Sequence, residues 1–441
     1  MPRTFTSLCV AMSVLAAFPA AAFAYQDDVN LPDALVSANP ADNTPVVPGG
    51  WDDPVTKEYE VNAFLAYNGV MYAGGKFPLV QSANGATSYP RSNMFAFDPN
   101  TGAVSPFAPD FNGQVQAITQ SGGYLYVSGD FSKVNGVTTS SVVKIDPSTG
   151  ALVTAFAPAI NGKVSDVDLA YGSLVIAGKF TTVGGQPRVG LANVDLVTGA
   201  VRSEVKPPIS GSLTSPTTGA CVTGGYRVAI NAQKTKLVLL GCFTKVFGYA
   251  REQLVLFNLG TAGMTIANWK SPDTIGDVCH GTANPAFMED VDFGPPGRYF
   301  YVAAGGGNRP GLCDSAFKYD TAATGALVHP NWVKKTGGDT LRAIEATQSY
   351  TYVAGHQRWI QQGGVSYDRP GIAALTAGTA TLSGWNPGKG REVGSRELYI
   401  TNSANHPGFP TGLWVGSDSG DCGYLVGEVR SHVGICFFPT P

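Results

Sequence analysis

The amino-acid sequence predicts an all-β fold, a seven-bladed β-propeller made of four-stranded blades. One pattern recurs along the chain at intervals of roughly 50 residues, the spacing of a propeller blade. The recurring segments alternate apolar and polar residues with period two, as β-strands do, and no long segment carries apolar residues at helical spacing. The last copy lacks a strand that the N-terminal segment can supply, which would close the ring.

The repeat occupies residues 59–441, and its first three copies are regular. Each copy opens with alternating apolar residues and continues to a strand ending in small-Gly-x-Phe. A third strand ends in apolar-Asp-x-x-Thr-Gly, and an aromatic residue then precedes proline. The step between copies is marked by a phenylalanine and an aspartate in each: Phe77, Phe131 and Phe180, and Asp98, Asp146 and Asp195. We predict that segments such as DPNTG and DPSTG are hairpin turns, because aspartate can accept backbone hydrogen bonds and glycine tolerates a positive φ.

The later copies diverge but keep the order, as in LVLLGCF, YFYVAAGGG and YTYVAGHQRW. The seventh begins at RELYITNSA and lacks its fourth strand. In the N-terminal segment, VVPGGWDDP places Trp51 ahead of Pro54 much as SGWNP places Trp385 ahead of Pro387. We therefore expect residues 25–58 to contribute the closing strand, which would remove the exposed edges of an open sheet.

Residues 1–24 are typical of a secretory signal peptide. They combine a basic start at Arg3, an apolar run from Leu8 to Ala17 and a small-residue end, AAAFA, before Tyr25. No other apolar stretch is long enough to span a bilayer. We expect a secreted, extracellular protein with no transmembrane anchor.

Charge and composition exclude several classes of protein. The chain has 441 residues, of which 44% are hydrophobic and 14% charged, enough apolar material for a core. Without Arg3 the mature chain keeps 28 basic and 32 acidic residues, and this acidic excess argues against a nucleic-acid-binding protein, which needs a basic surface. We expect a monomer that binds an extracellular ligand and no cofactor.

The mature chain keeps six of the seven cysteines, because Cys9 lies in the signal peptide. An even number in an exported protein indicates disulfides, although six cysteines allow many connectivities. Order along the chain favours the pairs Cys221–Cys242, Cys279–Cys313 and Cys422–Cys436. The metal-binding alternative is weak because no CxxC or HxxxH spacing is present, so we predict no metal site.

The copy GKFTTVGGQPRVGLANVDLVTG, residues 178–199, resembles the delta-60 repeat, a β-propeller family common in exported bacterial proteins. The C-terminal segments TGGDTLRAIEATQSYTYVAGHQRW and RPGIAALTAGTATLSGWNPGKGREVG resemble the tail of secreted actinobacterial propellers of this kind. The resemblance covers residues 59–441. It implies the fold and export but no reaction, and a link to carbohydrate rests on analogy with relatives that carry carbohydrate-binding modules.

The best candidates for a binding site interrupt the repeat in a loop. Long loops follow the second strands and link the blades, and elaborated loops on a rigid scaffold are where binding usually occurs. His356, Arg358 and Trp359 stand where the repeat has Lys-Phe, and Asp418 is the rough counterpart in the seventh copy. Together they would suit a sugar or an acidic group through stacking and bidentate hydrogen bonds. In the alternative interpretation, Arg358 bonds carbonyls or an acid of the next blade and Trp359 packs like the repeat phenylalanine.

Four arginines recur just before the third strands, and we interpret them as ties between blades: Arg91, Arg188, Arg251 and Arg369. No GxSxG elbow or distinct pair of carboxylates is visible, so no catalytic residue is predicted. The sequence therefore favours a non-catalytic binding or scaffold module for extracellular carbohydrate or protein. The alternatives are an extracellular carbohydrate-active enzyme, a hydrolase or lyase using the long-loop face, and a purely structural surface protein.

Overall fold

The computed structural model describes the chain in the following ranges: 34–49, 59–215, 219–274, 279, 285–307, 311–391, 394–418, 420–428, 430 and 432–441. The predicted signal peptide, residues 1–24, and Trp51 lie outside these ranges. The described part is all-β apart from two short 3₁₀ turns, η1 (Pro272–Thr274) and η3 (Tyr424–Val426). The all-β prediction is therefore confirmed.

Within the described residues, seven antiparallel sheets share one order, in which the first strand pairs with the second and the second with the third. We number these sheets 1 to 7 in chain order. Their first strands are β1 (Glu60–Tyr67), β6 (Val115–Ser121), β11 (Lys163–Ala170), β19 (Gly224–Ile230), β25 (Met288–Gly294), β29 (Leu341–Ala346) and β34 (Ser395–Thr401).

The second and third strands complete the central part of each sheet. The second strands are β2 (Val70–Lys76), β7 (Tyr124–Gly129), β12 (Ser173–Lys179), β20 (Lys236–Cys242), β26 (Tyr299–Ala304), β30 (Tyr350–Gly355) and β35 (Gly412–Ser417). The third strands are β5 (Met94–Phe97), β10 (Val142–Ile145), β15 (Leu191–Asp195), β23 (Leu254–Gly260), β27 (Ser315–Asp320), β33 (Ile372–Thr376) and β36 (Ile435–Pro439).

The fourth position is a full strand in sheets 4 and 5, as β24 (Gly263–Ile266) and β28 (Trp332–Lys335). In four other sheets a single bridge marks it: Phe97 with Val104, Ile145 with Leu152, Val194 with Val201, and Leu375 with Leu382.

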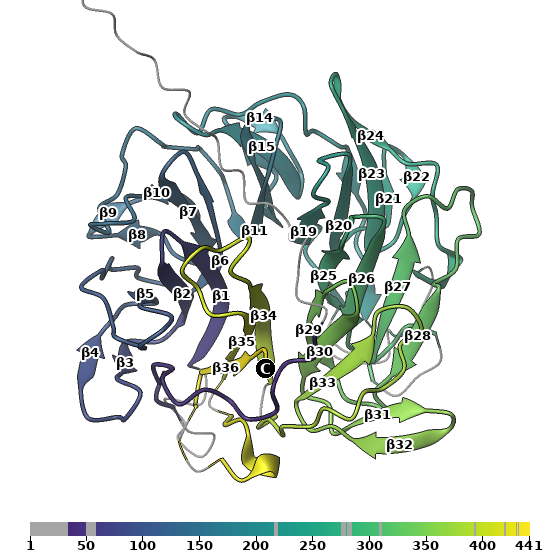
Figure 1. Ribbon diagram of the computed structural model, residues 1–441. Helices are drawn as coiled ribbons and strands as arrows, with labels where there is room; N and C mark the ends of the chain where they lie inside the picture. Colours follow the sequence, from purple (N-terminus) through teal and green to yellow (C-terminus); the bar gives the residue numbers. More distant parts are fainter. Residues whose placement is uncertain are drawn as a thin grey trace, which may run out of the picture.

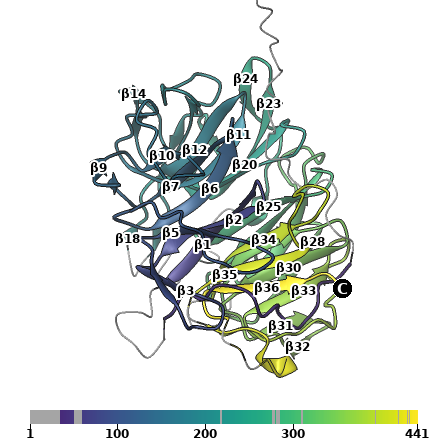
Figure 2. The ribbon, with the colours of Figure 1, turned by 60° about the vertical axis from the view of Figure 1, so that its left-hand side comes forward.

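The sheets have a propeller-like arrangement in which their first strands gather at the centre (Figures 1 and 2). Each first strand contacts the first strand of the following sheet, and β34 of sheet 7 contacts β1 of sheet 1. The apolar core lies between the faces of neighbouring sheets. One cluster, for example, joins Phe64 and Phe97 of sheet 1 to Trp414 and Phe437 of sheet 7. Burial of these faces is the main stabilising term.

Every first strand carries a β-bulge at the same register position. In sheet 3 the pairing shifts between Val164 and Asp166, so that Ser165 has no partner on β12. Opposite the bulge stands the repeat glycine of the second strand in five sheets, replaced by Ala304 in sheet 5 and Ser417 in sheet 7. A Cβ on Gly178 would lie 2.1 Å from the carbonyl oxygen of Lys163, closer than any side chain tolerates. The recurring glycine is therefore explained, where it occurs, by the close approach of a bulged strand.

Short hairpins follow the second strands in five sheets. They are β3 (Leu79–Gln81) with β4 (Ser88–Pro90), β8 (Lys133–Val134) with β9 (Val137–Thr138), β13 (Thr182–Val183) with β14 (Gln186–Pro187), β21 (Lys245–Val246) with β22 (Tyr249–Ala250), and β31 (Trp359–Gln362) with β32 (Val365–Asp368). The remaining short strands are β16 (Ile209–Ser210), β17 (Thr214–Ser215) and β18 (Gly219–Ala220).

The hairpins pair with the chain that arrives from the preceding sheet. Phe111 bridges to Val134, and Ile160 bridges to Val183. For sheet 1 the N-terminal segment takes this place, since Val46 bridges to Gln81.

The same N-terminal segment also lies along the outer side of sheet 7. The N–H of Ser37 donates to the carbonyl of Pro439 at 2.7 Å, and the N–H of Ala41 donates to that of Phe437 at 2.8 Å. Residues 34–49 thus contact the last and the first sheet at once.

The predicted turns and disulfides are confirmed. Oδ1 of Asp146 accepts hydrogen bonds from the hydroxyl of Ser148 and from the N–H groups of Ser148 and Thr149, and these bonds, that of the hydroxyl first, lower the pKa of Asp146. The three disulfides join the pairs favoured by chain order: Cys221–Cys242, Cys279–Cys313 and Cys422–Cys436.

The interpretation of the recurring arginines as ties between blades is wrong for three of them. Their Nη2 atoms donate to carbonyls on the outer segment of their own sheet: Arg91 to Ser105, Arg188 to Arg202 and Arg369 to Ser383. An arginine before the third strand lies beside the fourth position of the same sheet, because the hairpin folds back over it. These side chains therefore brace single sheets.

Candidate binding site at the centre of the sheets

A small polar cavity of ≈ 170 Å³ lies between the first strands of the sheets. Residues from all seven first strands line it. Its carboxylates are Asp166, Asp168, Asp290, Asp292, Glu345 and Glu397. Arg227 is the only basic residue among the described residues that line it. The cavity therefore carries a marked excess of acidic groups.

Several of these carboxylates are held by the edge of the following sheet. The N–H of Val228 donates to Oδ2 of Asp166 at 2.8 Å, and the N–H of Ile344 donates to Oδ2 of Asp290 at 3.0 Å. A first strand leaves its inner N–H groups without a strand partner, so an aspartate of the preceding sheet satisfies them. These aspartates are both acidic groups of the cavity and links between sheets.

Arg227 lies among three carboxylates that belong to sheets 3, 5 and 7. Its Nε is 3.6 Å from Oδ1 of Asp290, and the two side chains keep 20% and 19% of their surface accessible. Burial raises the pKa of Asp166 to about 7 and that of Asp290 to about 6, although Arg227 acts in the opposite direction on both. Burial and the neighbouring aspartates raise the pKa of Glu397 well above its usual range. The single positive charge of Arg227 does not balance the negative charges that three ionised carboxylates would carry in this partly buried site.

A second cavity of ≈ 320 Å³ adjoins the first, with Gln116 and Arg227 lining both. Bulged residues of four first strands line it, namely Gln116, Ser165, Tyr226 and Glu289. We call this second cavity the mouth. The ammonium of Lys179 lies 5.0 Å from the ring centroid of Tyr226, a cation–π contact at the same mouth.

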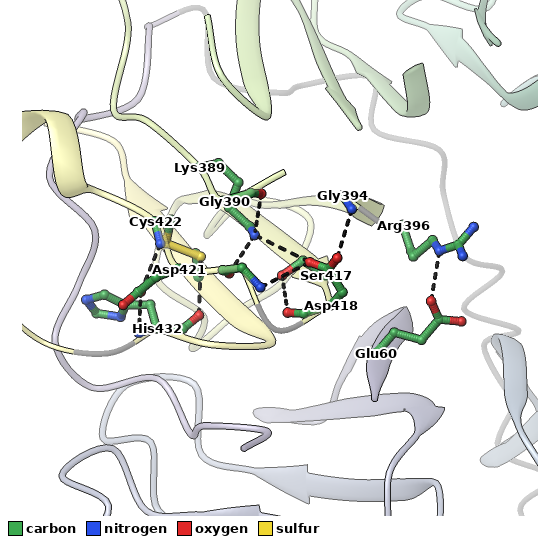
Figure 3. A network of polar contacts seen from close by, with 12 residues as sticks. Glu60, Lys389, Gly390, Gly394, Arg396, Ser417, Asp418, Asp421, Cys422 and His432 are labelled. Atoms are coloured by element: carbon green, nitrogen blue, oxygen red, sulfur yellow. Dashed lines mark hydrogen bonds and ion pairs between the residues drawn. A yellow bond between two sulfur atoms is a disulfide. The ribbon is translucent and has the colours of Figure 1, made fainter. Parts of the chain in front are cut away.

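The bulged residues of the remaining sheets extend this polar rim. Arg396 of β34 donates from Nε to Oε2 of Glu60 at 2.9 Å (Figure 3). Nη1 of Arg342 lies 3.7 Å from Oε2 of Glu289. A bulge frees its residue from the strand ladder and so re-aims that side chain, here toward a carboxylate of a neighbouring sheet.

Of the four residues predicted as a binding site, three from the loop after β30 and Asp418 after β35, the structure brings Arg358 and Trp359 together. The guanidinium carbon of Arg358 lies 5.2 Å from the centroid of the Trp359 ring, and its Nε donates to Oδ2 of Asp339 at 3.0 Å. Arg358 is 51% exposed. Asp339 precedes β29 in the same sheet, so this ion pair fastens the loop to its own sheet.

Asp418 and the backbone of His356 both lie close to Gly394. Oδ2 of Asp418 accepts a hydrogen bond from the N–H of Gly394 at 2.9 Å, and Nζ of Lys389 is 4.0 Å from Oδ1 (Figure 3). Asp418 is buried, with 1% of its surface exposed, and His356 is half-buried. The described contacts do not join Asp418 to Arg358, and binding by these four residues stays a prediction.

Replacing Arg358 with alanine is expected to lower the free energy of unfolding by less than about 1 kcal/mol, because its ion pair is half exposed. Urea denaturation measures this change. Arg298→Ala is the matched control, since Arg298 is 58% exposed and contacts Asp320 at 2.7 Å. If Arg358→Ala prevents folding while Arg298→Ala does not, Arg358 has a structural role and is no ligand-binding residue.

Sequence reasoning missed the seven bulged residues, which are Asn62, Gln116, Ser165, Tyr226, Glu289, Arg342 and Arg396. All seven are polar, and each follows a small or apolar residue at the start of its strand, as in VNA, VQA, VSD and MED. Alignment of the seven copies on the repeat glycine would have shown this column.

Comparisons with known proteins show no family. No family model matches the chain, and no curated protein matches it. Two similar solved structures are the computationally designed Ika8 protein, with TM-score 0.44 and 9% identity, and the β-propeller domain of Cps50 (Swd1) from Myceliophteria thermophila, with TM-score 0.45 and 10% identity. Each match covers 87% of this chain and 96% of the other. We transfer no activity, ligand or partner from either.

A search of the described residues for membrane-spanning helices finds none that is long and apolar enough.

Proposed function

We propose that the chain is a seven-bladed propeller whose last blade is completed by the N-terminal segment. The hydrogen bonds from Ser37 and Ala41 to β36 support this proposal, because they give sheet 7 the outer partner that it otherwise lacks. The bridge from Val46 to Gln81 then continues the segment to sheet 1, as the other links do. On this proposal the domain spans residues 25–441, after a signal peptide of residues 1–24.

We also propose that the protein is secreted and belongs with the delta-60 repeat propellers. The signal-like residues 1–24 and the resemblance of residues 178–199 support this assignment. The three disulfides are compatible with an oxidising, extracellular environment.

We propose that the protein is a non-catalytic binding module that takes a positively charged side chain of an extracellular protein into the acidic central cavity. One observation carries the proposal, namely that Asp166, Asp290 and Glu397 surround a single arginine and have raised pKa values. A lysine or arginine side chain entering through the mouth would supply the missing positive charge and hydrogen-bond donors.

The carbohydrate-active alternative has less support. The cavity volume of ≈ 170 Å³ is below the roughly 300–1,000 Å³ of pockets that enclose small ligands. Asp166 and Asp290 also accept backbone hydrogen bonds from neighbouring sheets, which fixes them as links. A long aliphatic side chain with a charged end fits such a narrow site better than a sugar ring does.

The test uses labelled pentapeptides that carry arginine, lysine or citrulline at the centre, with the mature protein at constant salt. We expect the two charged peptides to bind and the citrulline peptide to bind at least tenfold more weakly. Binding should strengthen from pH 5 to pH 8, since Asp166 and Asp290 lose their protons through about pH 7 and 6 and only the ionised groups attract a cation.

The variants Asp290→Asn and Glu397→Gln separate the cavity from general attraction to an acidic protein. Each should weaken binding of the arginine peptide about tenfold or more, whereas the control Asp98→Asn, in an exposed turn, should leave it unchanged. Equal binding by all variants would contradict the proposal. Binding of neutral oligosaccharides that survives Asp290→Asn would favour the carbohydrate alternative.

A further inference from the structure

A second group of ionisable side chains lies where the N-terminal segment meets the end of the chain. A ring nitrogen of His432 and one carboxylate oxygen from each of Asp42 and Glu428 lie within 4.8 Å of one another. Asp42 belongs to the N-terminal segment, whereas Glu428 and His432 precede β36. This cluster is separate from the central cavity and from the loop after β30.

The imidazole of His432 has one engaged and one free nitrogen. Nδ1 lies 3.2 Å from the hydroxyl oxygen of Thr44, while Nε2 is buried and has no hydrogen-bond partner. The residue is 1% exposed, so water does not readily satisfy Nε2, and a buried polar atom without a partner costs about 1–3 kcal/mol. Histidines that bind metals commonly use one nitrogen as the ligand and hold the other by a hydrogen bond.

The surroundings of His432 fix its backbone and favour the neutral ring. Its N–H donates to Oδ1 of Asp421 at 2.7 Å, beside the disulfide of Cys422 (Figure 3). Burial lowers the pKa of His432, although Asp421 and Glu428 act in the opposite direction. A neutral imidazole is the form that donates a lone pair to a metal ion.

The carboxylate of Asp42 is at present paired with Arg430. Nε of Arg430 lies 3.4 Å from Oδ2 of Asp42, and the two side chains are 52% and 54% exposed. An ion pair this exposed contributes little to stability, so a metal ion can displace Arg430 at small cost. Glu428 accepts a hydrogen bond from the N–H of Arg430 at 2.7 Å through Oε1, which holds its carboxylate beside the cluster.

We propose that Asp42, Glu428 and His432 bind a divalent transition-metal ion of the Zn²⁺ class. One imidazole and two carboxylates form a ligand set that zinc accepts, whereas Ca²⁺ takes oxygen ligands. Zinc ligands about 2.0–2.2 Å from the ion lie roughly 3.4 Å apart, so the three atoms need to approach by about an ångström. The bound ion would join the N-terminal segment to the last sheet and fasten the two ends of the fold.

The test is calorimetric titration of the chelator-treated mature protein with Zn²⁺, with Ca²⁺ titrated in parallel. We expect one zinc site per chain and no matching calcium site. Asp42→Asn and Glu428→Gln should each weaken zinc binding at least tenfold, because each removes a charged ligand from an accessible position. The controls Asp110→Asn and His329→Gln, at exposed positions away from the cluster, should bind as the wild type does.

Hydrogen exchange supplies a second measurement that does not depend on the buried His432. Zinc should slow exchange in residues 34–49 of the wild type and leave it unchanged in Glu428→Gln. Zinc binding that persists in the Asp42→Asn and Glu428→Gln variants would overturn the proposal. Failure of the wild type to bind zinc at micromolar concentration would overturn it equally.

Discussion

Replacing Arg227 with methionine is expected to lower the free energy of unfolding by about 2–4 kcal/mol at pH 8, because it leaves the half-buried carboxylates of the central cavity without their counter-charge. Arg227 lies 3.6 Å from Asp290 and also attracts Asp166 and Glu397. Methionine fills a similar volume, so the loss reports charge more than packing. Chemical denaturation followed by tryptophan fluorescence measures it.

The effect of Arg227→Met should depend on pH in a defined direction. The folded pKa values of Asp166 and Asp290, about 7 and 6, lie above those of an unfolded chain, so these groups stabilise the fold when protonated, and that contribution is lost as the pH rises through 6 to 7. Removal of Arg227 raises both pKa values further. The variant should therefore approach wild-type stability at pH 5 and fall furthest below it at pH 8.

Lys163→Met is the matched control for Arg227→Met. Lys163 contacts Asp130 on the same side of the fold, but it is 60% exposed, so its removal should change stability by less than about 1 kcal/mol at either pH. A loss after Arg227→Met that is equal at pH 5 and pH 8 would contradict the role assigned to the carboxylates.

Replacing Trp385 with alanine is expected to cost about 3–5 kcal/mol and to release the N-terminal segment. The indole is 4% exposed, packs edge-on against Tyr352 and Phe438, and donates from Nε1 to the carbonyl of Ser37 at 3.0 Å. The side chain thus connects sheets 6 and 7 with residues 34–49. Hydrogen exchange in that segment should become much faster, and limited proteolysis should cut there first.

Trp332→Ala is the control, because Trp332 also packs on a tyrosine and donates to a carbonyl, that of Ala377, but lies away from the N-terminal segment. It should destabilise the fold without changing exchange in residues 34–49. If both variants expose that segment equally, global unfolding rather than loss of the Trp385 contact is responsible.

The strands, turns and disulfides could be predicted because each depends on residues that lie close together in the sequence and recur in every copy of the repeat. The turns at Asp98, Asp146 and Asp195 form because the aspartate side chain accepts hydrogen bonds from backbone N–H groups two and three residues further on. Each cysteine pairs with the next cysteine along the mature chain, so the order of the cysteines was enough to predict the three disulfides. The N-terminal segment was expected to complete the last blade. The observed bonds to β36 come from Ser37 and Ala41, upstream of Trp51, which lies outside the described residues.

The central cavity could not be predicted in the same way. Asp166, Arg227, Asp290 and Glu397 lie on four different first strands, and only the arrangement of the sheets brings them together. Whether a polar residue is paired or bulged depends on the register between two strands, which single-sequence periodicity does not show. The loop after β30 was predicted as a site because its side chains depart from the repeat. The bulged residues occupy the same position in every copy, so they show no such departure.

The seven bulges separate the residues that build the sheets from the residues that set the chemistry of the surface around the central axis. A bulged residue has no partner on the second strand, and the residue opposite is a small one in all seven sheets, glycine in five of them. The bulged residues thus form a set of seven positions, one per sheet and four of them at the mouth, that substitution can change while the hydrogen-bonded ladders persist. Asparagine, glutamine, serine, tyrosine, glutamate and two arginines are one combination among many that the same scaffold can display. Under the proposed function, substitution at these positions would change which side chain the mouth accepts without changing the sheets that carry it.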